Sequence, residues 1–248
     1  MKKLFLTTIL LTSVLFGGIT ANATTSTNIN INTNQEILTL MPGMTIKEVD
    51  EMIKETANSL GKSEDEIATQ ILSELKTQQE LTEKEKSKLT KGSSGGGGSV
   101  TTYTLGAAKY NGDVFYEPAS TFSVQHGHVG IYWTSDIVVE SMPGDGVRSI
   151  NRTNKKVEKG SKIFTFSGVS VATQNDASNW AYARKGESYS YNFATNRTTS
   201  HYGAKNCSKL VWSAYKVKAN LDLDKDGGLG VYPKDILYHS KSSVYKSY

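Results

Sequence analysis

The chain contains a single cysteine, Cys207, among its 248 residues. This excludes an intramolecular disulfide, although small secreted domains often depend on such bonds. A lone cysteine is either a buried apolar side chain or a thiol retained for its reactivity. Histidine is also scarce, with four residues in the chain. His126 and His128 have no clear third ligand near them in the sequence, so we predict no metal site and no cofactor.

Long apolar runs are missing after residue 23. Before it, two lysines precede the apolar stretch Leu4–Gly18, and Ala21-Asn22-Ala23 has the small residues of a cleavage site. That stretch is shorter than the ~20 residues that a membrane-spanning helix needs. We predict a signal peptide over residues 1–23, cleaved near Ala23. The mature protein is expected to be secreted, either extracellular or associated with the cell wall.

Charge is unevenly distributed along the chain. Residues 24–91 carry 8 basic and 12 acidic side chains, whereas residues 100–248 carry 18 basic and 12 acidic ones. A mildly basic exported region suits an anionic partner such as a cell-wall polymer or a membrane surface. The basic residues are scattered and form no stripe, which argues against a nucleic-acid partner.

The N-terminal part of the chain predicts helices. Residues 24–44, which begin with a Thr/Asn-rich tract, are expected to be disordered. Residues 45–91 predict a helical hairpin or triplet: Thr45–Glu48 is a capping-box pattern, Ser63–Glu66 caps a second helix, and a short third helix is expected from Thr82. These helices are interpreted as a pro-segment, a spacer or a docking unit, and the three alternatives stay open.

Residues 92–99 form a flexible Gly/Ser linker, of natural or engineered origin. The remaining 100–248 show short strand-like runs and amphipathic helical segments, enough for one compact α+β domain. The expected strands are Val100–Leu105, Asp113–Tyr116, His128–Trp133, Ile137–Glu140 and Lys162–Phe166, with a last strand that includes Ile236–Tyr238; helices are expected at Thr173–Arg184 and Cys207–Lys218.

Cys207 is predicted to lie in the first turn of a helix. Apolar residues at 210, 211, 214 and 215 follow it at helical spacing. The free N–H groups and the dipole at a helix start favour a thiolate. A reactive thiol together with a distant histidine is the minimal set for a cysteine nucleophile.

His128 and Glu140 are predicted to face each other across a strand pair. They are twelve positions apart, and a hairpin centred on Thr134 would place them directly opposite. A carboxylate that holds an imidazole sets its tautomer and supports its protonated form. An ordinary cross-strand polar pair is the alternative when the two residues are considered alone. His126, two residues earlier on the same face, is the alternative base.

Several motifs occur in the order of a known group of enzymes. They are Gly127-His128-Val129-Gly130-Ile131-Tyr132, Val138-Val139-Glu140-Ser141 and Asn206-Cys207-Ser208-Lys209-Leu210-Val211-Trp212, with supporting segments at Gly112–Phe115, Pro143–Val147, Gly186–Phe193 and Val231–Leu237. Residues 105–242 thereby resemble circularly permuted papain-like enzymes, the YiiX-like and lecithin–retinol-acyltransferase-like branches of the NlpC-type cell-wall hydrolase superfamily. In that group the histidine strand precedes the cysteine helix, as His128 precedes Cys207 here. Asn206 departs from the pattern, because relatives often carry an aromatic residue there.

The resemblance implies a permuted papain-like domain with an antiparallel sheet and a cysteine-bearing helix, preceded by the small helical region. It implies Cys207 as nucleophile, His128 as general base and acid, and Glu140 as the residue that orients His128. The backbone N–H of Cys207 is the expected oxyanion donor. Tyr202 and Tyr116 are candidates for a second donor.

The function expected from this reading is a secreted cysteine amidase or peptidase that cleaves amide bonds in cell-wall peptides. One alternative is acyl transfer or lipid and ester deacylation by the same three residues. Another is a catalytically silent binding module or secreted effector. The expected partner is a cell-wall peptide or another acyl or amide substrate, with peripheral association with the wall or the membrane; the oligomeric state stays open.

Asp222-Leu223-Asp224-Lys225-Asp226-Gly227 resembles the start of a calcium loop. Counted from Asp222, position twelve is Pro233 and not the bidentate glutamate, which excludes an EF-hand. A solvated turn is expected here, with a weaker calcium site as the alternative. His201 and His239 have no partner pattern and are expected at the surface.

Overall fold

The computed structural model describes residues 23–91, 101–118 and 126–248. Residues 1–22 of the signal peptide predicted over 1–23, and the linker predicted at 92–99, lie outside these residues. The helices are α1 (Ala23–Leu40), α2 (Ile46–Leu60), α3 (Glu64–Lys91), α4 (Val171–Tyr182), α5 (Cys207–Ala219) and α6 (Pro233–Leu237), with 3-10 turns η1 (Arg152–Asn154) and η2 (Asn196–Thr198). The strands are β1 (Thr102–Thr104), β2 (Val114–Glu117), β3 (His128–Tyr132), β4 (Ile137–Met142), β5 (Gly146–Asn151), β6 (Lys156–Glu158), β7 (Lys162–Phe166) and β8 (Ser242–Ser247).

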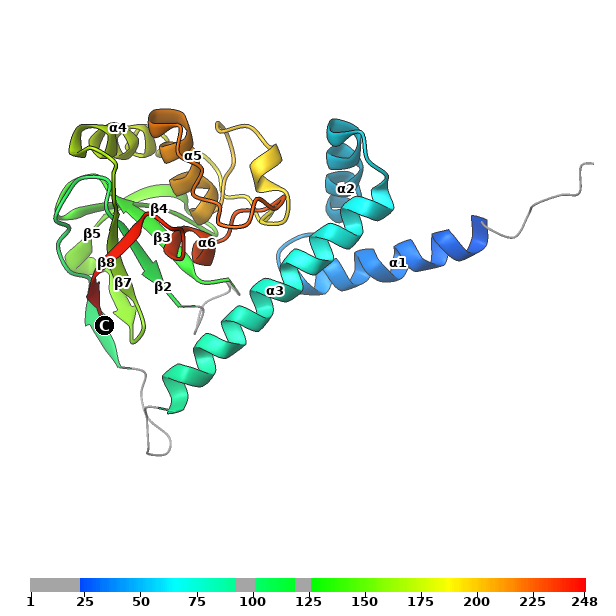
Figure 1. Cartoon of the computed structure of the whole chain (residues 1–248), viewed down its shortest axis with the longest axis horizontal. Helices are drawn as coiled ribbons and strands as arrows, with labels where there is room; N and C mark the ends of the chain where they lie inside the picture. Colours follow the sequence, from blue (N-terminus) through cyan, green and yellow to red (C-terminus); the bar gives the residue numbers. More distant parts are fainter. Residues whose placement is uncertain (1–22, 92–100, 119–125) are drawn as a thin grey trace, which may run out of the picture.

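The C-terminal domain is built on a six-stranded sheet with the order β5-β4-β3-β2-β7-β8, all pairs antiparallel. A separate two-stranded ladder joins β1 and β6. Helices α4 and α5 lie side by side, and α5 packs on β3 and β4 (Figure 1). The prediction of an α+β protein with an antiparallel sheet and a helical N-terminal region is confirmed.

Strand β3 is buried along its whole length, because both faces of the sheet are covered. Val129 and Ile131 pack with the apolar face of α5, whereas Tyr132 packs in a second cluster with Phe115. Side chains alternate between the two faces of a strand. The central position of β3 therefore places His128, its first residue, in a largely water-excluded part of the domain.

Residues 23–40 form helix α1, so the prediction of a disordered tract over 24–44 was wrong. The Thr/Asn-rich sequence has low helix propensity, which was the basis of that prediction. Ile37 and Met41, at its C-terminal end, are buried against the apolar residues of α2 and α3. Tertiary packing of a short apolar face contributes more to helix stability than propensity does.

Helix α3 is continuous from Glu64 to Lys91, so no separate third helix begins at Thr82. Thr82 is buried inside α3, and its hydroxyl donates to the carbonyl of Gln78, one turn earlier. Lys234 of the C-terminal domain donates to the same hydroxyl at 2.7 Å. The threonine that suggested a helix start is thus a contact between α3 and the domain.

The prediction of a last strand around Ile236–Tyr238 was also wrong, since Pro233–Leu237 is helix α6. Proline is favoured in the first turn of a helix, where its missing N–H costs no hydrogen bond. Asp235 completes the start by accepting a hydrogen bond from the backbone N–H of Tyr232 at 2.8 Å. The closing strand is instead β8, which pairs with β7.

The helical arm, defined as α1 to α3, docks on the C-terminal domain through α3, whose cyan ribbon runs beside the domain in Figure 1. One apolar cluster includes residues of both parts, and polar contacts add to it: Glu85 accepts from the Tyr116 hydroxyl at 2.6 Å, and Gln78 donates to Asp235 at 3.2 Å. Buried polar contacts of this kind fix orientation because an unpaired partner would be costly. Within the described ranges, every helix is too short or too polar to cross a bilayer.

Candidate active site

Cys207 is the first residue of α5, and its side chain is fully buried. Asn206 caps the helix: its side-chain oxygen accepts from the N–H of Lys209 at 2.9 Å, and its amide donates to the carbonyl of Asn192 at 2.9 Å. An asparagine cap satisfies one of the free N–H groups of a helix start and holds the neighbouring backbone in place. Asn206, where the sequence departs from the pattern of the enzymes that it resembles, is therefore a helix cap beside the thiol.

The register of β3 and β4 differs from the prediction. Ile131 pairs with Val139, and Tyr132 with Val138, so the hairpin is centred on Ser135 and not on Thr134. Continuing this register puts Glu140 opposite Gly130, and His128 on the diagonal. Gly130 has no side chain to intervene, and a Cβ there would lie 2.4 Å from the ring of Phe115. The glycine thus leaves space for the ring of Phe115, which also lies beside the ring of His128.

His128 and Glu140 form the contact that the sequence predicts, in spite of the shifted register. His128 Nε2 lies 2.9 Å from Glu140 Oε2, and both residues are buried. The other ring nitrogen, Nδ1, has no hydrogen-bond partner of standard geometry among the described residues. The contact with Glu140 therefore leaves Nδ1 available to another group.

Glu140 is held by two cations that the sequence analysis did not identify. Arg148 donates to Glu140 Oε1 from Nη2 at 2.7 Å and from Nε at 3.0 Å, and Lys155 Nζ lies 3.1 Å from Oε2. Arg148 pairs directly with Glu140 in the β4–β5 hairpin. The Pro143–Gly146 turn was the signal that could have located Arg148. Lys155 lies beyond η1, and no local pattern pointed to it.

The electrostatics of the pair favour a protonated His128. Burial lowers the pKa of His128, but the hydrogen bond and charge of Cys207, followed by the hydrogen bond to Glu140, outweigh it and raise the pKa to about 9. Lys155 opposes this rise. Burial alone would raise the pKa of Glu140, but His128, Lys155 and Arg148 together hold it below its usual range. The arrangement is that of an imidazolium between a thiol and a carboxylate.

Tyr189 is the tyrosine electrostatically coupled to Cys207. Burial, followed by the charges at Cys207 and Tyr191, raises the pKa of Tyr189. The predicted candidates for a second oxyanion donor differ from it. Tyr202 is 57% exposed, and the Tyr116 hydroxyl is already committed to Glu85. Neither predicted tyrosine therefore has a hydroxyl that is both buried and unengaged.

The remaining histidines are placed away from this arrangement. His126 is buried between the rings of Phe193 and Tyr232, and burial followed by the charge of Lys234 lowers its pKa to about 4. A neutral histidine without a carboxylate partner among the described residues lacks the support that His128 has. His201 Nδ1 forms a hydrogen bond with the Ser213 hydroxyl, and its ring lies against that of Trp212. His239 accepts from the backbone N–H of Lys241.

A cavity of about 530 Å³ lies between the helical arm and the segment that contains Tyr189. One wall is formed by α2, and the other by residues 189–192 with 195, 198, 199 and 204. The wall from α2 carries three glutamates, Glu48, Glu51 and Glu55. Tyr189 lines this cavity, and a charge at Cys207 contributes to the raised pKa of Tyr189.

Among the described residues, one group of His, Cys, Asp or Glu side chains has the spacing of a metal site. It consists of Asp224, Asp226 and Asp235, and it contains neither His126 nor His128. The predicted Asp222–Asp226 loop thus contributes two of its three aspartates. The third member, Asp235, comes from α6.

Comparison with known proteins identified one curated relative. The Bacillus subtilis (strain 168) protein YycO, described as uncharacterized, is 39% identical over 213 residues, which is 86% of this chain and 85% of YycO. A solved structure of the metalloprotein YiiX from Escherichia coli O157:H7 is a distant likeness, with a TM-score of 0.41 and 13% identity over 59% of this chain and 99% of YiiX. No protein-family model matches the chain.

Proposed function

Because the chain belongs to the family of the uncharacterized protein YycO, its activity has to be argued from its own site, and we propose that it is a cysteine hydrolase. The observation that carries this proposal is the alignment of Cys207, His128 and Glu140 at the start of α5 and on β3 and β4. A nucleophile, a base and a group that orients the base are the requirements for covalent catalysis. The proposal includes the permuted papain-like assignment, which the order of the residues supports.

The proposed reaction is cleavage of an amide bond. The Cys207 thiolate attacks the carbonyl carbon, and the backbone N–H at the start of α5 stabilises the oxyanion. As the C–N bond breaks, His128 donates its proton to the leaving amine, which leaves a thioester on Cys207. The neutral His128 then takes a proton from water, and the hydroxide bonds to the thioester carbon. The C–S bond breaks, which releases the carboxylic acid and regenerates the Cys207 thiolate beside the protonated His128.

Glu140 is proposed to hold His128 in one tautomer and orientation. Its hydrogen bond to Nε2 leaves Nδ1 directed to the thiol side. Arg148 and Lys155 keep Glu140 ionised and immobile, since each engages a different carboxylate oxygen. A buried carboxylate without such cations would have a raised pKa and would support the imidazolium poorly.

We assign cell-wall peptides as the substrate class and export as the route by which the enzyme reaches them. The predicted signal peptide and the motif resemblance support this assignment. The three glutamates on the α2 wall of the cavity that Tyr189 lines also support it, because carboxylates attract the ammonium groups that branched or unlinked peptides carry.

The test is to incubate the mature protein with purified peptidoglycan and to analyse soluble fragments by mass spectrometry. We expect peptide fragments with new amino groups, in amounts that depend on Cys207. A thiol-directed probe should label the native protein at Cys207. No fragment release together with rapid labelling would point to ester or lipid acyl substrates. No release together with an inert thiol would contradict the hydrolase proposal.

The upper limb of the pH profile is expected to follow His128. The acid that protonates the leaving amine must be charged, so kcat/KM should fall as the pH rises through about 9. Replacing Glu140 with glutamine removes a charge and hydrogen bond that raise the pKa of His128, and the limb should move to lower pH. The Lys155→Met variant removes a charge that lowers this pKa, and the limb should move to higher pH. If the upper limb of the pH profile stayed at the wild-type pH in both variants, its assignment to His128 would be contradicted.

Tyr189 is expected to assist the oxyanion. The Tyr189→Phe variant should lower kcat by about 10²-fold with little change in KM, because a donor to the developing charge acts in the transition state. Tyr191→Phe is the matched control, since Tyr191 lies beside it and is 39% exposed. Steady-state kinetics on one peptide substrate makes the comparison, and equal activities of the two variants would refute the role of Tyr189.

A further inference from the structure

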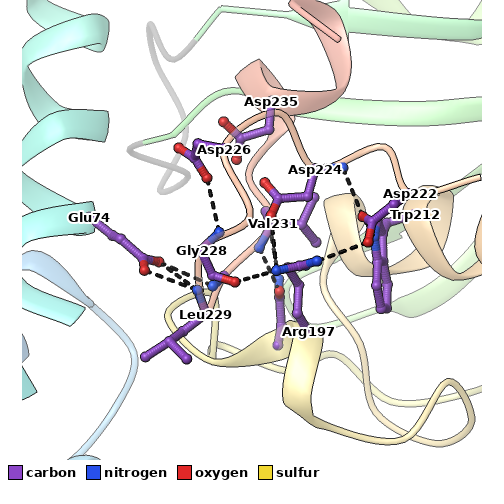
Figure 2. Close-up of polar contacts among 12 residues, drawn as sticks. Glu74, Arg197, Trp212, Asp222, Asp224, Asp226, Gly228, Leu229, Val231 and Asp235 are labelled. Atoms are coloured by element: carbon purple, nitrogen blue, oxygen red, sulfur yellow. Dashed lines mark hydrogen bonds and ion pairs between the residues drawn. The ribbon is translucent and has the colours of Figure 1, made fainter. Parts of the chain in front are cut away.

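The loop after α5 brings together a different set of carboxylates from the one that its sequence suggests. Asp222 turns away, accepting from Trp212 Nε1 at 2.7 Å and from Arg197 Nη2 at 2.9 Å. Asp235 of α6 takes its place beside Asp224 and Asp226, as Figure 2 shows. Counted along the chain from Asp224, Asp235 is the twelfth residue. The twelve-residue span that ends on a carboxylate thus starts at Asp224, the second aspartate of the loop, and not at Asp222, the first.

The three side chains have the spacing of ligands to one ion. Each contributes an oxygen, and the three oxygens lie within 4.8 Å of one another. Calcium binds oxygens at 2.3–2.6 Å. Two oxygens on opposite sides of one Ca²⁺ are therefore separated by about twice that distance, which matches the 4.8 Å limit of this group. Nitrogen and sulfur ligands are absent from this group, and an all-oxygen set favours a hard cation.

Buried polar atoms around the cluster have no partner among the described residues. Asp224 is buried, with its Oδ2 3.1 Å from Arg197 Nη1 and its Oδ1 without a hydrogen bond. In Figure 2 one oxygen of Asp224 faces Arg197, and the other faces the side of Asp226 and Asp235. The Tyr232 hydroxyl and Gln78 Oε1, both in residues at least 98% buried, are also unpartnered. Orphaned buried oxygens of this kind indicate an absent ligand.

Negative charge exceeds positive charge at this place. Four carboxylates gather here, those of Glu74, Asp224, Asp226 and Asp235, and Arg197 is the cation that contacts one of them. Carboxylates crowded in this way are costly unless a cation is bound between them.

Helix α3 contributes to the same place from the helical arm. Glu74 accepts from the backbone N–H of Leu229 at 2.9 Å and of Gly230 at 3.2 Å, and Gln78 Nε2 donates to Asp235 Oδ1 at 3.2 Å. Helix and loop are in close contact, since a Cβ at Gly228 would lie 2.7 Å from the Glu74 carboxyl. An interaction that immobilises the loop after α5 therefore also immobilises α3.

We propose that Asp224, Asp226 and Asp235 bind a calcium ion, and that this ion fastens the helical arm to the C-terminal domain. Asp224 contributes its unpartnered Oδ1 while its Oδ2 stays with Arg197. Gln78 and Glu74 hold Asp235 and the loop from the side of α3. The ion is a structural one, so the docked position of the arm depends on extracellular calcium.

The experiment uses the full mature chain after treatment with a chelator, titrated with calcium chloride and followed by calorimetry. We expect a dissociation constant in the range of extracellular calcium modules, about 10⁻⁴–10⁻³ M. Asp226→Asn and Asp235→Asn should each weaken binding at least about tenfold, because ligand charge sets affinity. Asp222→Asn is the matched control from the same loop, and it should bind as the wild type does. Asp226 is exposed, so its variant should fold even if the Asp235 variant does not.

Hydrogen exchange with and without calcium tests the second part of the proposal. Amides of α3 around residues 74–85 should exchange more slowly in calcium, and Asp226→Asn should abolish this change. Absence of calcium binding at millimolar concentration, or wild-type affinity in Asp226→Asn, would overturn the site. An equal loss in Asp222→Asn would assign the ion to the linear motif instead. Calcium binding without slower exchange in α3 would overturn the fastening role.

Discussion

Replacing Cys207 with alanine is expected to lower kcat/KM for amide hydrolysis by about 10⁴-fold or more, because the thioester can no longer form. The protein should stay folded. Removing one buried sulfur leaves a small cavity, and the expected cost is about 1 kcal/mol. Kinetics on a peptide substrate, with thermal unfolding of the same samples, measures both effects.

The control for this prediction is His128→Ala, which keeps the thiol but removes the base and acid. It should lose activity to a similar degree, since groups that act as a unit show non-additive losses. A double variant should be no worse than either single one. Activity near that of the wild type in Cys207→Ala would exclude Cys207 as the nucleophile, and with it the proposed reaction.

Replacing Glu140 with alanine is expected to destabilise the protein by about 3–5 kcal/mol, because Arg148 and Lys155 would lose their fully buried shared carboxylate and keep only the more exposed Asp145 and Glu117. The loss applies where the carboxylate is ionised, and the pKa of Glu140 is lowered in the fold. Its stabilising effect is therefore present above the usual pKa of a glutamate and disappears as the pH falls below it. Denaturant unfolding at neutral and acidic pH measures the difference.

The Glu140→Gln variant separates the role of Glu140 in orienting His128 from its role in the stability of the fold. It keeps the shape of the side chain and should reduce kcat less than Cys207→Ala does, by about 10²-fold, because Glu140 only orients His128. Asp145→Asn is the matched control, since Asp145 contacts the same Arg148 from an exposed position. Its effect on stability should be within about 1 kcal/mol. If Glu140→Ala were as stable as Asp145→Asn, the buried contacts of Glu140 would not contribute the predicted stability.

Local patterns in the sequence were enough to identify the candidate catalytic residues. The apolar repeat after Cys207 predicts a helix that begins there, and α5 begins at Cys207. The apolar runs at 128–133 and 137–140 predict two strands, and β3 and β4 lie there. These features are local, since a helix start and strand alternation depend on residues a few positions apart.

Only the tertiary structure decided the features that depend on contacts between distant segments. The packing of Ile37 and Met41 stabilises α1. The strand register puts Glu140 opposite Gly130. The fold also brings Lys155 to Glu140. It also exchanges Asp222 for Asp235 in the carboxylate cluster. No local pattern encodes these contacts, because each arises from packing of elements that are separate in the sequence. The sequence by itself determined which residues have the required chemistry and which elements carry them, and the packing determined which of those residues meet.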